Sequence, residues 1–328
     1  MVPPVLRRAH FWTSLPPTGK TSSNSSDTKR SGAHLMNKPV IGFIGLGLMG
    51  GNMVANLQAR GFEMVVMGRR KTAVDAVLLR GSAREVSTPK ELAEASDIIM
   101  LCVTTSDVVE SLVYGDEGIL AGIKDGAVLI DFGTSIPAST RKIGTDLAAK
   151  GAGMIDAPLG RTPAHAKDGL LNIMAAGDKA TFDKVKPVLD EQGENVFYLG
   201  ALGAGHVTKL INNYMGMTTV CAMSQAFAVA DRAGVDRAQL YDIMSAGPSN
   251  SPFMGFCKNY AVDRISDLGF SINNAKKDLG YFLHMVDDIG TRAEIAEGTM
   301  QNLRSAVDAG LGDGNVPEIF DYYRQLES

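Results

Sequence analysis

The chain has 328 residues, 45% of them hydrophobic, which is enough to build a folded core, and typical domain sizes favour two domains. Residues 39–328 carry 26 basic and 35 acidic side chains, so this part has a net charge of about −9. Such an acidic body repels a phosphate backbone, which argues against a nucleic-acid partner. No stretch approaches the ~20 apolar residues that a membrane helix needs, so we expect no membrane partner.

The three cysteines are Cys102, Cys221 and Cys257, which are far apart and form no CxxC pair. This pattern indicates neither a disulfide framework nor a zinc site, and it is typical of a reducing compartment. We therefore expect a cytoplasmic protein without a metal centre.

Residues 1–37 are rich in proline, serine, threonine and basic residues and lack a hydrophobic period, which predicts a disordered extension. Its Arg- and Ser-rich composition fits an organellar transit peptide. It equally fits a dispensable tail before an internal start at Met36, where the ordered pattern begins.

Residues 38–202 alternate apolar runs with amphipathic helical segments. Helices are expected near 52–60, 72–80, 108 and 139–150, and strands at 40–47, 64–68, 97–103, 127–133 and 153–159. Continuous apolar strands separated by helices predict a parallel sheet covered on both faces.

The remaining residues, 203–328, predict an all-α domain. Residues 206–233 form one helical stretch without proline, on the order of 40 Å long, that ends at Gly234. Further helical patterns lie near 236–246, 273–288 and 293–309, and no convincing strand appears. The segment 248–252 has the composition of a turn, and a place at the border of the active site is the alternative.

A glycine-rich turn joins the first expected strand to the first helix. Gly45, Gly47 and Gly50 form a GxGxxG pattern in the sequence GLGLMG. The first glycine permits a tight turn, the second lets the backbone approach a pyrophosphate, and the third lets helix and strand pack closely. The pattern alone is a weak signal, but its place between strand and helix predicts dinucleotide binding.

The end of the second strand indicates which dinucleotide binds. NAD-specific sites usually place an acidic residue there to hold the ribose 2′-hydroxyl, whereas this chain has Gly68, Arg69 and Arg70. Arginine suits a 2′-phosphate because its planar fork donates two hydrogen bonds. We therefore expect NADP, with NAD as the alternative; the two arginines would otherwise be a solvated helix start.

Lys209 and Asn213 lie at positions i and i+4 of the expected long helix, with Asn212 beside them. A lysine in the first helical turn feels the positive end of the dipole, and desolvation also lowers its pKa toward the range useful for proton transfer. Lys209 is then a candidate proton donor, and Asn213 a second ligand for the same substrate oxygen. Taken alone, the segment equally fits a surface lysine at a helix start.

Five ordered motifs, FIGLGLMG, IDFGTSIP, DAP, GAGHVTKLINN and KKDLG, resemble those of the β-hydroxyacid dehydrogenases, the family of 3-hydroxyisobutyrate and tartronate semialdehyde dehydrogenases. The resemblance covers residues 40–328 and implies a Rossmann-type N-terminal domain, an all-α C-terminal domain for substrate binding and oligomerisation, and a homodimer or homotetramer. It implies a catalytic role for Lys209 and cofactor contacts for the following residues: Leu48, Met49, Val103, Thr134 and Lys277.

The substrate loop departs from the common family pattern. Where most members have Ser-Gly-Gly, this chain has Gly160-Arg161-Thr162, which resembles the loop of 3-sulfolactaldehyde reductases. The resemblance implies that this loop binds the acid group of a small anionic substrate. Two other positions depart from that subgroup, because Gly216 replaces a serine that contacts substrate and Gly68-Arg69 replaces a strand end with aspartate.

The sequence thus predicts an NAD(P)-dependent oxidoreductase that interconverts a small acidic hydroxy compound and its semialdehyde, with 3-sulfolactaldehyde as one candidate. The alternatives are dehydrogenases of the 3-hydroxyisobutyrate, tartronate semialdehyde or 4-hydroxybutyrate type. An alternative of another class is a non-catalytic dinucleotide-binding scaffold, which the presence of Lys209 disfavours.

Overall fold

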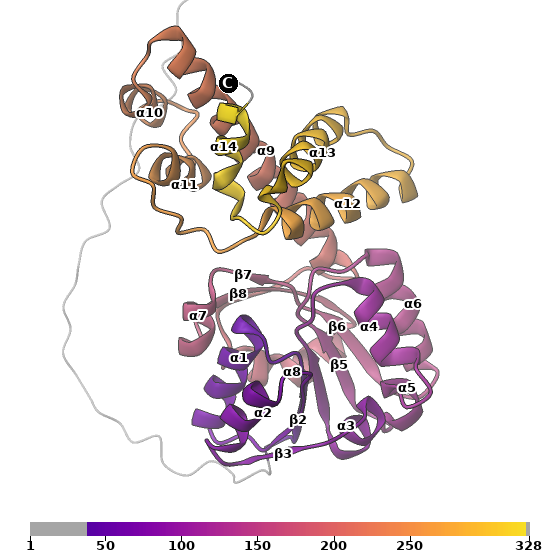
Figure 1. Cartoon of the computed structure of the whole chain (residues 1–328). Helices are drawn as coiled ribbons and strands as arrows, with labels where there is room; N and C mark the ends of the chain where they lie inside the picture. Colours follow the sequence, from indigo (N-terminus) through magenta and orange to yellow (C-terminus); the bar gives the residue numbers. More distant parts are fainter. Residues whose placement is uncertain (1–37, 326–328) are drawn as a thin grey trace, which may run out of the picture. The chain divides into compact units, whose positions relative to one another are not determined.

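The computed structural model describes residues 38–325. The predicted disordered extension, residues 1–37, lies outside this range. From Lys38 onward the chain forms one compact unit, in which a sheet with flanking helices precedes a helical region (Figure 1).

The sheet has the strand order β3-β2-β1-β4-β5-β6-β8-β7, with β9 paired to β8. The strands are β1 (Ile41–Ile44), β2 (Met64–Met67), β3 (Ala83–Glu85), β4 (Ile98–Leu101), β5 (Val128–Asp131), β6 (Gly153–Asp156), β7 (Leu159–Gly160), β8 (Leu171–Gly177) and β9 (Gly193–Tyr198). The first six are parallel. The parallel arrangement was predicted for five of them, whereas β3, a short Ala-Arg-Glu segment, was not expected. The chain reverses at β8, which pairs antiparallel with β6 and β7, so the sheet is mixed and not wholly parallel.

Helices cover both faces of this sheet (Figure 1). They are α1 (Leu48–Ala59), α2 (Lys71–Leu78), α3 (Pro89–Ala95), α4 (Ser106–Tyr114), α5 (Ile119–Gly122), α6 (Pro137–Ala148), α7 (Pro163–Asp168) and α8 (Lys179–Leu189). Successive residues of the buried strands face opposite sides, so Phe43 joins the core under α1, α2 and α8, while Ile44 joins the core under α3–α6.

The helical region has a separate core. It comprises α9 (Ala204–Ala233), α10 (Arg237–Ser245), α11 (Pro252–Ala261), α12 (Ile272–Asp288), α13 (Glu294–Ala306), a π-helical turn (Val307–Leu311), a 3₁₀ turn (Val316–Glu318) and α14 (Ile319–Gln325). Among residues 204–325 there is no strand, only an isolated bridge between Ser271 and Asn315. The predicted all-α character of this region is therefore confirmed.

Glycines in the left-handed region bound the long helix α9, with φ of +93° at Gly203 and +72° at Gly234. The helix begins two residues earlier than the sequence predicts. The segment 248–252 is indeed a connection, and it ends where Ser251 caps α11 and Pro252 takes the first helical position. No helix in residues 38–325 is long and apolar enough to span a membrane.

Candidate active site

The three glycines of the predicted dinucleotide turn have distinct surroundings. Gly45 has a φ of +107°, and a Cβ there would lie 2.2 Å from the carbonyl oxygen of Cys102. A Cβ at Gly50 would lie 2.0 Å from the carbonyl oxygen of Gly45, so helix α1 packs closely on the turn. Gly47 has open space around it and is exposed. This arrangement fits a pyrophosphate over Gly47 at the start of α1, next to the β1–β4 point where the strand order reverses.

Leu48 and Met49 form the first turn of α1. The Leu48 side chain is 82% exposed, whereas Met49 packs against the core below the helix. The two residues therefore present backbone N–H groups at the helix start, as an anion site requires.

The end of β2 carries exposed cations and no acidic residue. Arg69 and Arg70 are exposed, and the Arg70 guanidinium donates a 3.3 Å hydrogen bond to the carbonyl oxygen of Leu46 in the glycine turn. Gly68 is packed, because a Cβ there would lie 2.9 Å from Val74. The cations therefore lie beside the turn that would hold the pyrophosphate.

Other residues with implied cofactor contacts gather at the carboxyl ends of β4 and β5. Val103 follows β4, and its Cγ1 would lie 3.2 Å from a Cβ at Gly45. The Lys277 ammonium, from α12, donates to the carbonyl oxygen of Thr104 at 2.7 Å and to that of Thr134 at 3.5 Å. The structure thus brings Gly45, Val103, Thr134 and Lys277 to one edge of the sheet.

Lys209 is half-buried, and its Nζ donates a 2.7 Å hydrogen bond to the carbonyl oxygen of Leu159 in β7. Burial lowers the pKa of the Lys209 ammonium, and the nearby Lys277 lowers it further, whereas Asp278 opposes the shift. The sequence placed Lys209 in the first helical turn. Because α9 starts at Ala204, Lys209 is in the second turn, where the dipole has faded, and desolvation is the main cause of the shift.

The Asp278 side chain contacts both Asn213 and Lys277, and the residue is 2% exposed. Its Oδ2 accepts a 2.7 Å hydrogen bond from the Asn213 amide, and its Oδ1 lies 2.8 Å from the Lys277 ammonium. Asn212 is exposed and its amide lies 3.4 Å from the Asn213 Oδ1. Sequence reasoning missed Asp278, although the motif KKDLG contains it; an acid directly after two lysines in one motif was the available signal.

The Gly160-Arg161-Thr162 loop starts with Gly160, the last residue of β7, and therefore begins next to Leu159, which Lys209 contacts. Arg161 adopts a left-handed backbone with φ of +75°. Its guanidinium donates a 2.7 Å hydrogen bond to the carbonyl oxygen of Leu170 and forms an ion pair with Glu194 of β9. Thr162 shares a 2.8 Å hydrogen bond with His165. The sequence predicted neither partner of Arg161.

Gly216 is buried in α9 against an aromatic ring of α11. A Cβ at this position would lie 2.5 Å from the Cζ atom of Phe253. The ring therefore occupies the space in which a serine side chain would stand, which gives the departure at Gly216 a physical reason.

Comparison with known proteins matches both halves of the chain. Residues 40–200 match the family described as the NAD binding domain of 6-phosphogluconate dehydrogenase, and residues 203–323 match the NAD-binding family of NADP-dependent 3-hydroxyisobutyrate dehydrogenase. The chain belongs to the β-hydroxyacid dehydrogenase family. It is an NAD(P)-dependent oxidoreductase of the hydroxyacid dehydrogenase and semialdehyde reductase type. The alternative of a non-catalytic dinucleotide-binding scaffold is therefore wrong.

Two Arabidopsis thaliana relatives show the similarity. The probable 3-hydroxyisobutyrate dehydrogenase-like 2, mitochondrial, is 30% identical over 88% of this chain and 95% of its own length. Glyoxylate/succinic semialdehyde reductase 1 is 30% identical over 86% of this chain and 97% of its own. The solved structure of Mycobacterium tuberculosis 3-hydroxyisobutyrate dehydrogenase with L-serine has the same fold, with a TM-score of 0.77, 24% identity, and coverage of 87% of this chain and 99% of that one.

Proposed function

We propose that this enzyme uses NADP in preference to NAD and interconverts a small semialdehyde that carries an acid group with the corresponding hydroxy acid. The observation that carries the proposal is the desolvated Lys209 ammonium beside the start of the Gly160-Arg161-Thr162 loop. The proton donor and the anion site would then contact two groups of one small substrate.

Lys209 is the proposed general acid and base. When bound, NADPH supplies a hydride to the carbonyl carbon of the substrate. Lys209 donates a proton to the carbonyl oxygen in reduction, and its neutral amine removes that proton from the hydroxyl in oxidation. The lowered pKa makes the neutral amine of Lys209 more accessible near neutral pH. The same residue can therefore donate the proton in reduction and accept it in oxidation.

Asn213 is the proposed second ligand of the same oxygen. Its amide nitrogen carries two hydrogens, and the hydrogen bond to Asp278 uses one of them. The other is free to bind the carbonyl oxygen while charge develops on it. Asp278 fixes the amide orientation through this hydrogen bond.

Arg161 is the proposed partner of the acid group, with Gly160 and Thr162 supplying backbone and hydroxyl donors. Its guanidinium pairs with Glu194, so an anionic substrate would take the place of that carboxylate. A carboxylate fits this site, in keeping with the relative named for glyoxylate and succinic semialdehyde. A sulfonate is the finer candidate, favoured by the Gly-Arg-Thr sequence of the loop.

The cofactor preference rests on Arg69 and Arg70 at the acid-free end of β2. A 2′-phosphate would gain charge-assisted hydrogen bonds there, whereas a 2′-hydroxyl would find no carboxylate acceptor at that strand end.

A substrate panel tests this proposal. NADPH-dependent kcat/KM is measured for 3-sulfolactaldehyde, succinic semialdehyde, tartronate semialdehyde and methylmalonate semialdehyde, with a neutral aldehyde of equal length as control. The proposal predicts that at least one anionic substrate exceeds the neutral aldehyde by tenfold or more. Equal values for all aldehydes would contradict the anion site.

Assembly and location remain predictions for this chain. We propose a homodimer or homotetramer formed through residues 203–328, in a cytoplasmic setting. Light scattering after size-exclusion chromatography measures the mass, and a monomer would contradict the assembly.

A further inference from the structure

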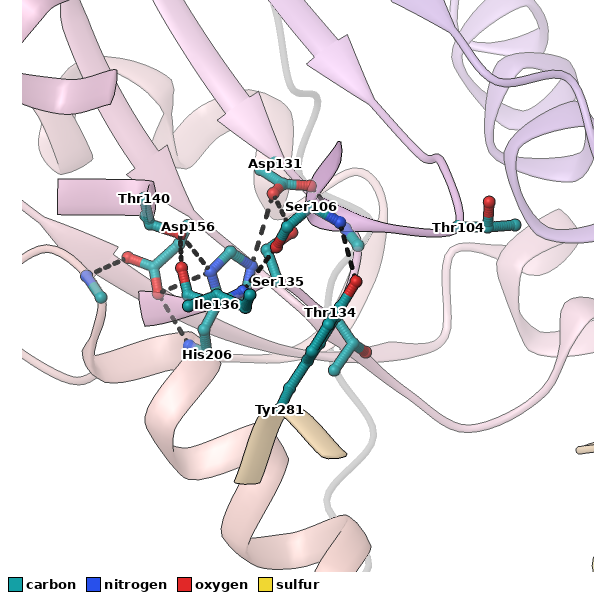
Figure 2. A network of polar contacts seen from close by, with 12 residues as sticks. Thr104, Ser106, Asp131, Thr134, Ser135, Ile136, Thr140, Asp156, His206 and Tyr281 are labelled. Carbon is teal, nitrogen blue, oxygen red and sulfur yellow. Dashed lines mark hydrogen bonds and ion pairs between the residues drawn. The ribbon is translucent and has the colours of Figure 1, made fainter. Parts of the chain in front are cut away.

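Three ionisable side chains, sealed from solvent, lie together where β5, β6 and the start of α9 meet (Figure 2). Asp131 ends β5, Asp156 ends the neighbouring strand β6, and the two are paired in register. His206 lies in the first turn of α9, one turn before Lys209. All three residues have 0% exposure.

Asp131 fixes the turn that carries Thr134. Its Oδ1 accepts a 2.8 Å hydrogen bond from the Gly133 amide, and its Oδ2 accepts a 2.7 Å hydrogen bond from the Ser135 hydroxyl. This turn holds the Thr134 carbonyl that faces Lys277.

Asp156 fixes the start of α9. Its Oδ1 accepts a 2.7 Å hydrogen bond from the Gly203 amide, and its Oδ2 accepts one of 2.7 Å from the His206 amide. These are helix N-terminal N–H groups that otherwise lack helical partners, so the carboxylate acts as a buried cap.

The His206 ring lies between these two carboxylates (Figure 2). Its Nδ1 shares a 2.9 Å hydrogen bond with the Thr140 hydroxyl, which also lies 3.2 Å from the carbonyl oxygen of Ile136. Its Nε2 lies 3.6 Å from Asp131 Oδ2, and its Nδ1 lies 3.8 Å from Asp156 Oδ2.

The ring therefore spaces two buried acids that would otherwise face each other in a medium that weakly screens charge. Burial raises the pKa of the Asp156 carboxyl, and the charge of His206 opposes that shift. Other ionisable groups face the cluster, namely Cys102 beside Asp131 and Arg141 of α6 beside Gly203.

We propose that His206 is a positioning residue for the hydride-transfer reaction, because it holds the Thr134 turn and the start of the Lys209 helix at one fixed spacing. The inference rests on the proposed role of Lys209 as proton donor. His206 and Lys209 are three positions apart and lie on one side of α9. A shift of the helix start by about 1 Å would move the Lys209 Nζ away from the substrate carbonyl oxygen. A misplacement of this size can lower the rate by about 100-fold.

Two variants test the inference in the full-length enzyme. His206→Phe keeps an aromatic ring but leaves both carboxylates without a polar spacer, whereas His206→Gln keeps a polar group that can hydrogen-bond to Thr140. We expect His206→Phe to lower kcat by 30-fold or more and His206→Gln to lower it less, with KM for NADPH within threefold of wild type in both.

The pH profile gives a second readout that mere loss of stability would not move. Reduction needs the Lys209 ammonium, so its rate falls as the pH rises through the pKa of Lys209. A loosened helix start admits water, reverses part of the desolvation, and moves this fall to higher pH in the His206 variants. Leu303→Ala, a core truncation in α13, is the control that lowers Tm and leaves kcat and the pH profile unchanged.

The outcomes separate this inference from the proposed function. If Lys209→Ala is inactive while folded His206→Gln and His206→Phe keep wild-type kcat and pH profile, the positioning role is wrong and the function stands. If His206→Phe does not fold, an unchanged kcat in His206→Gln alone overturns the inference. Wild-type kcat in Lys209→Ala would instead overturn the proposed function.

Discussion

The Nζ atom of Lys209 lies 2.7 Å from the carbonyl oxygen of Leu159. This hydrogen bond joins the helix that carries the proposed proton donor to the strand from which the proposed substrate loop begins. A substrate held by Gly160-Arg161-Thr162 would therefore present its far end to Lys209, and displacement of the lysine from Leu159 would free a proton for transfer.

Asp278→Asn tests the electrostatic setting of Lys209. Asp278 opposes the lowering of the Lys209 pKa, so its neutralisation should lower that pKa further. Reduction needs the Lys209 ammonium, so the fall of its rate with rising pH should move to lower pH than in wild type. Oxidation needs the neutral amine, so the rise of its rate should also move to lower pH. The pH dependence of kcat in both directions is the measurement, and a shift of either profile to higher pH would contradict this arrangement.

Lys209→Met tests the cost of burying the lysine. The folded state holds the Lys209 pKa below its unfolded value, so between the two values the unfolded chain binds more protons, and wild-type stability rises with pH across that window. The methionine variant should lack this rise. We expect its Tm at neutral pH to be equal to or above wild type, measured by calorimetry, and a drop of several degrees would show that the lysine is a net stabilising group.

Arg69→Ala should raise KM for NADPH about tenfold or more and change KM for NADH little, because the 2′-phosphate alone loses its charged hydrogen bonds. Arg80→Ala, which removes an exposed arginine beyond the end of α2, is the matched control and should affect neither cofactor. Equal losses with both cofactors would show that Arg69 does not bind the phosphate.

Arg161→Ala should lower kcat/KM for the anionic substrate and affect a neutral aldehyde far less. The loss of kcat/KM should correspond to about 2–4 kcal/mol of transition-state stabilisation. Arg161→Lys should restore part of the loss, since a point charge lacks the planar fork.

Glu194→Gln removes the competing carboxylate and should lower KM for the anionic substrate. If Glu194→Gln leaves KM unchanged while Arg161→Ala is severe, substrate binds Arg161 without displacing Glu194. Equal loss with neutral and anionic substrates in Arg161→Ala would remove Arg161 from the anion site.

Features set by short stretches of chain were predictable from the sequence. The glycine turn, the apolar strands β1, β2, β4, β5 and β6, and the i, i+4 placement of Lys209 and Asn213 each depend on residues within one or two elements. The strand reversal at β8 was missed, because Asn172 interrupts the apolar run of β8 and no strand was expected there. β9 was missed as well, because it is only partly buried.

Pairings between distant residues could not be predicted. Asn213 and Asp278 are 65 positions apart, and nothing local indicates that the two side chains meet. The same holds for Arg161 with Glu194 and for Gly216 with Phe253. The start of α9 was placed two residues late, because Ala204 and Gly205 carry no side-chain signal for a helix, and this error assigned too large a role to the dipole.

The most direct test of the central claim is the rate of NADPH oxidation by Lys209→Ala with the best anionic semialdehyde of the panel. We expect kcat to fall by about 10²–10⁴-fold, as for loss of a general acid, with NADPH affinity and Tm close to wild type. A folded Lys209→Ala enzyme with wild-type kcat would contradict Lys209 as the proton donor and with it the proposed mechanism.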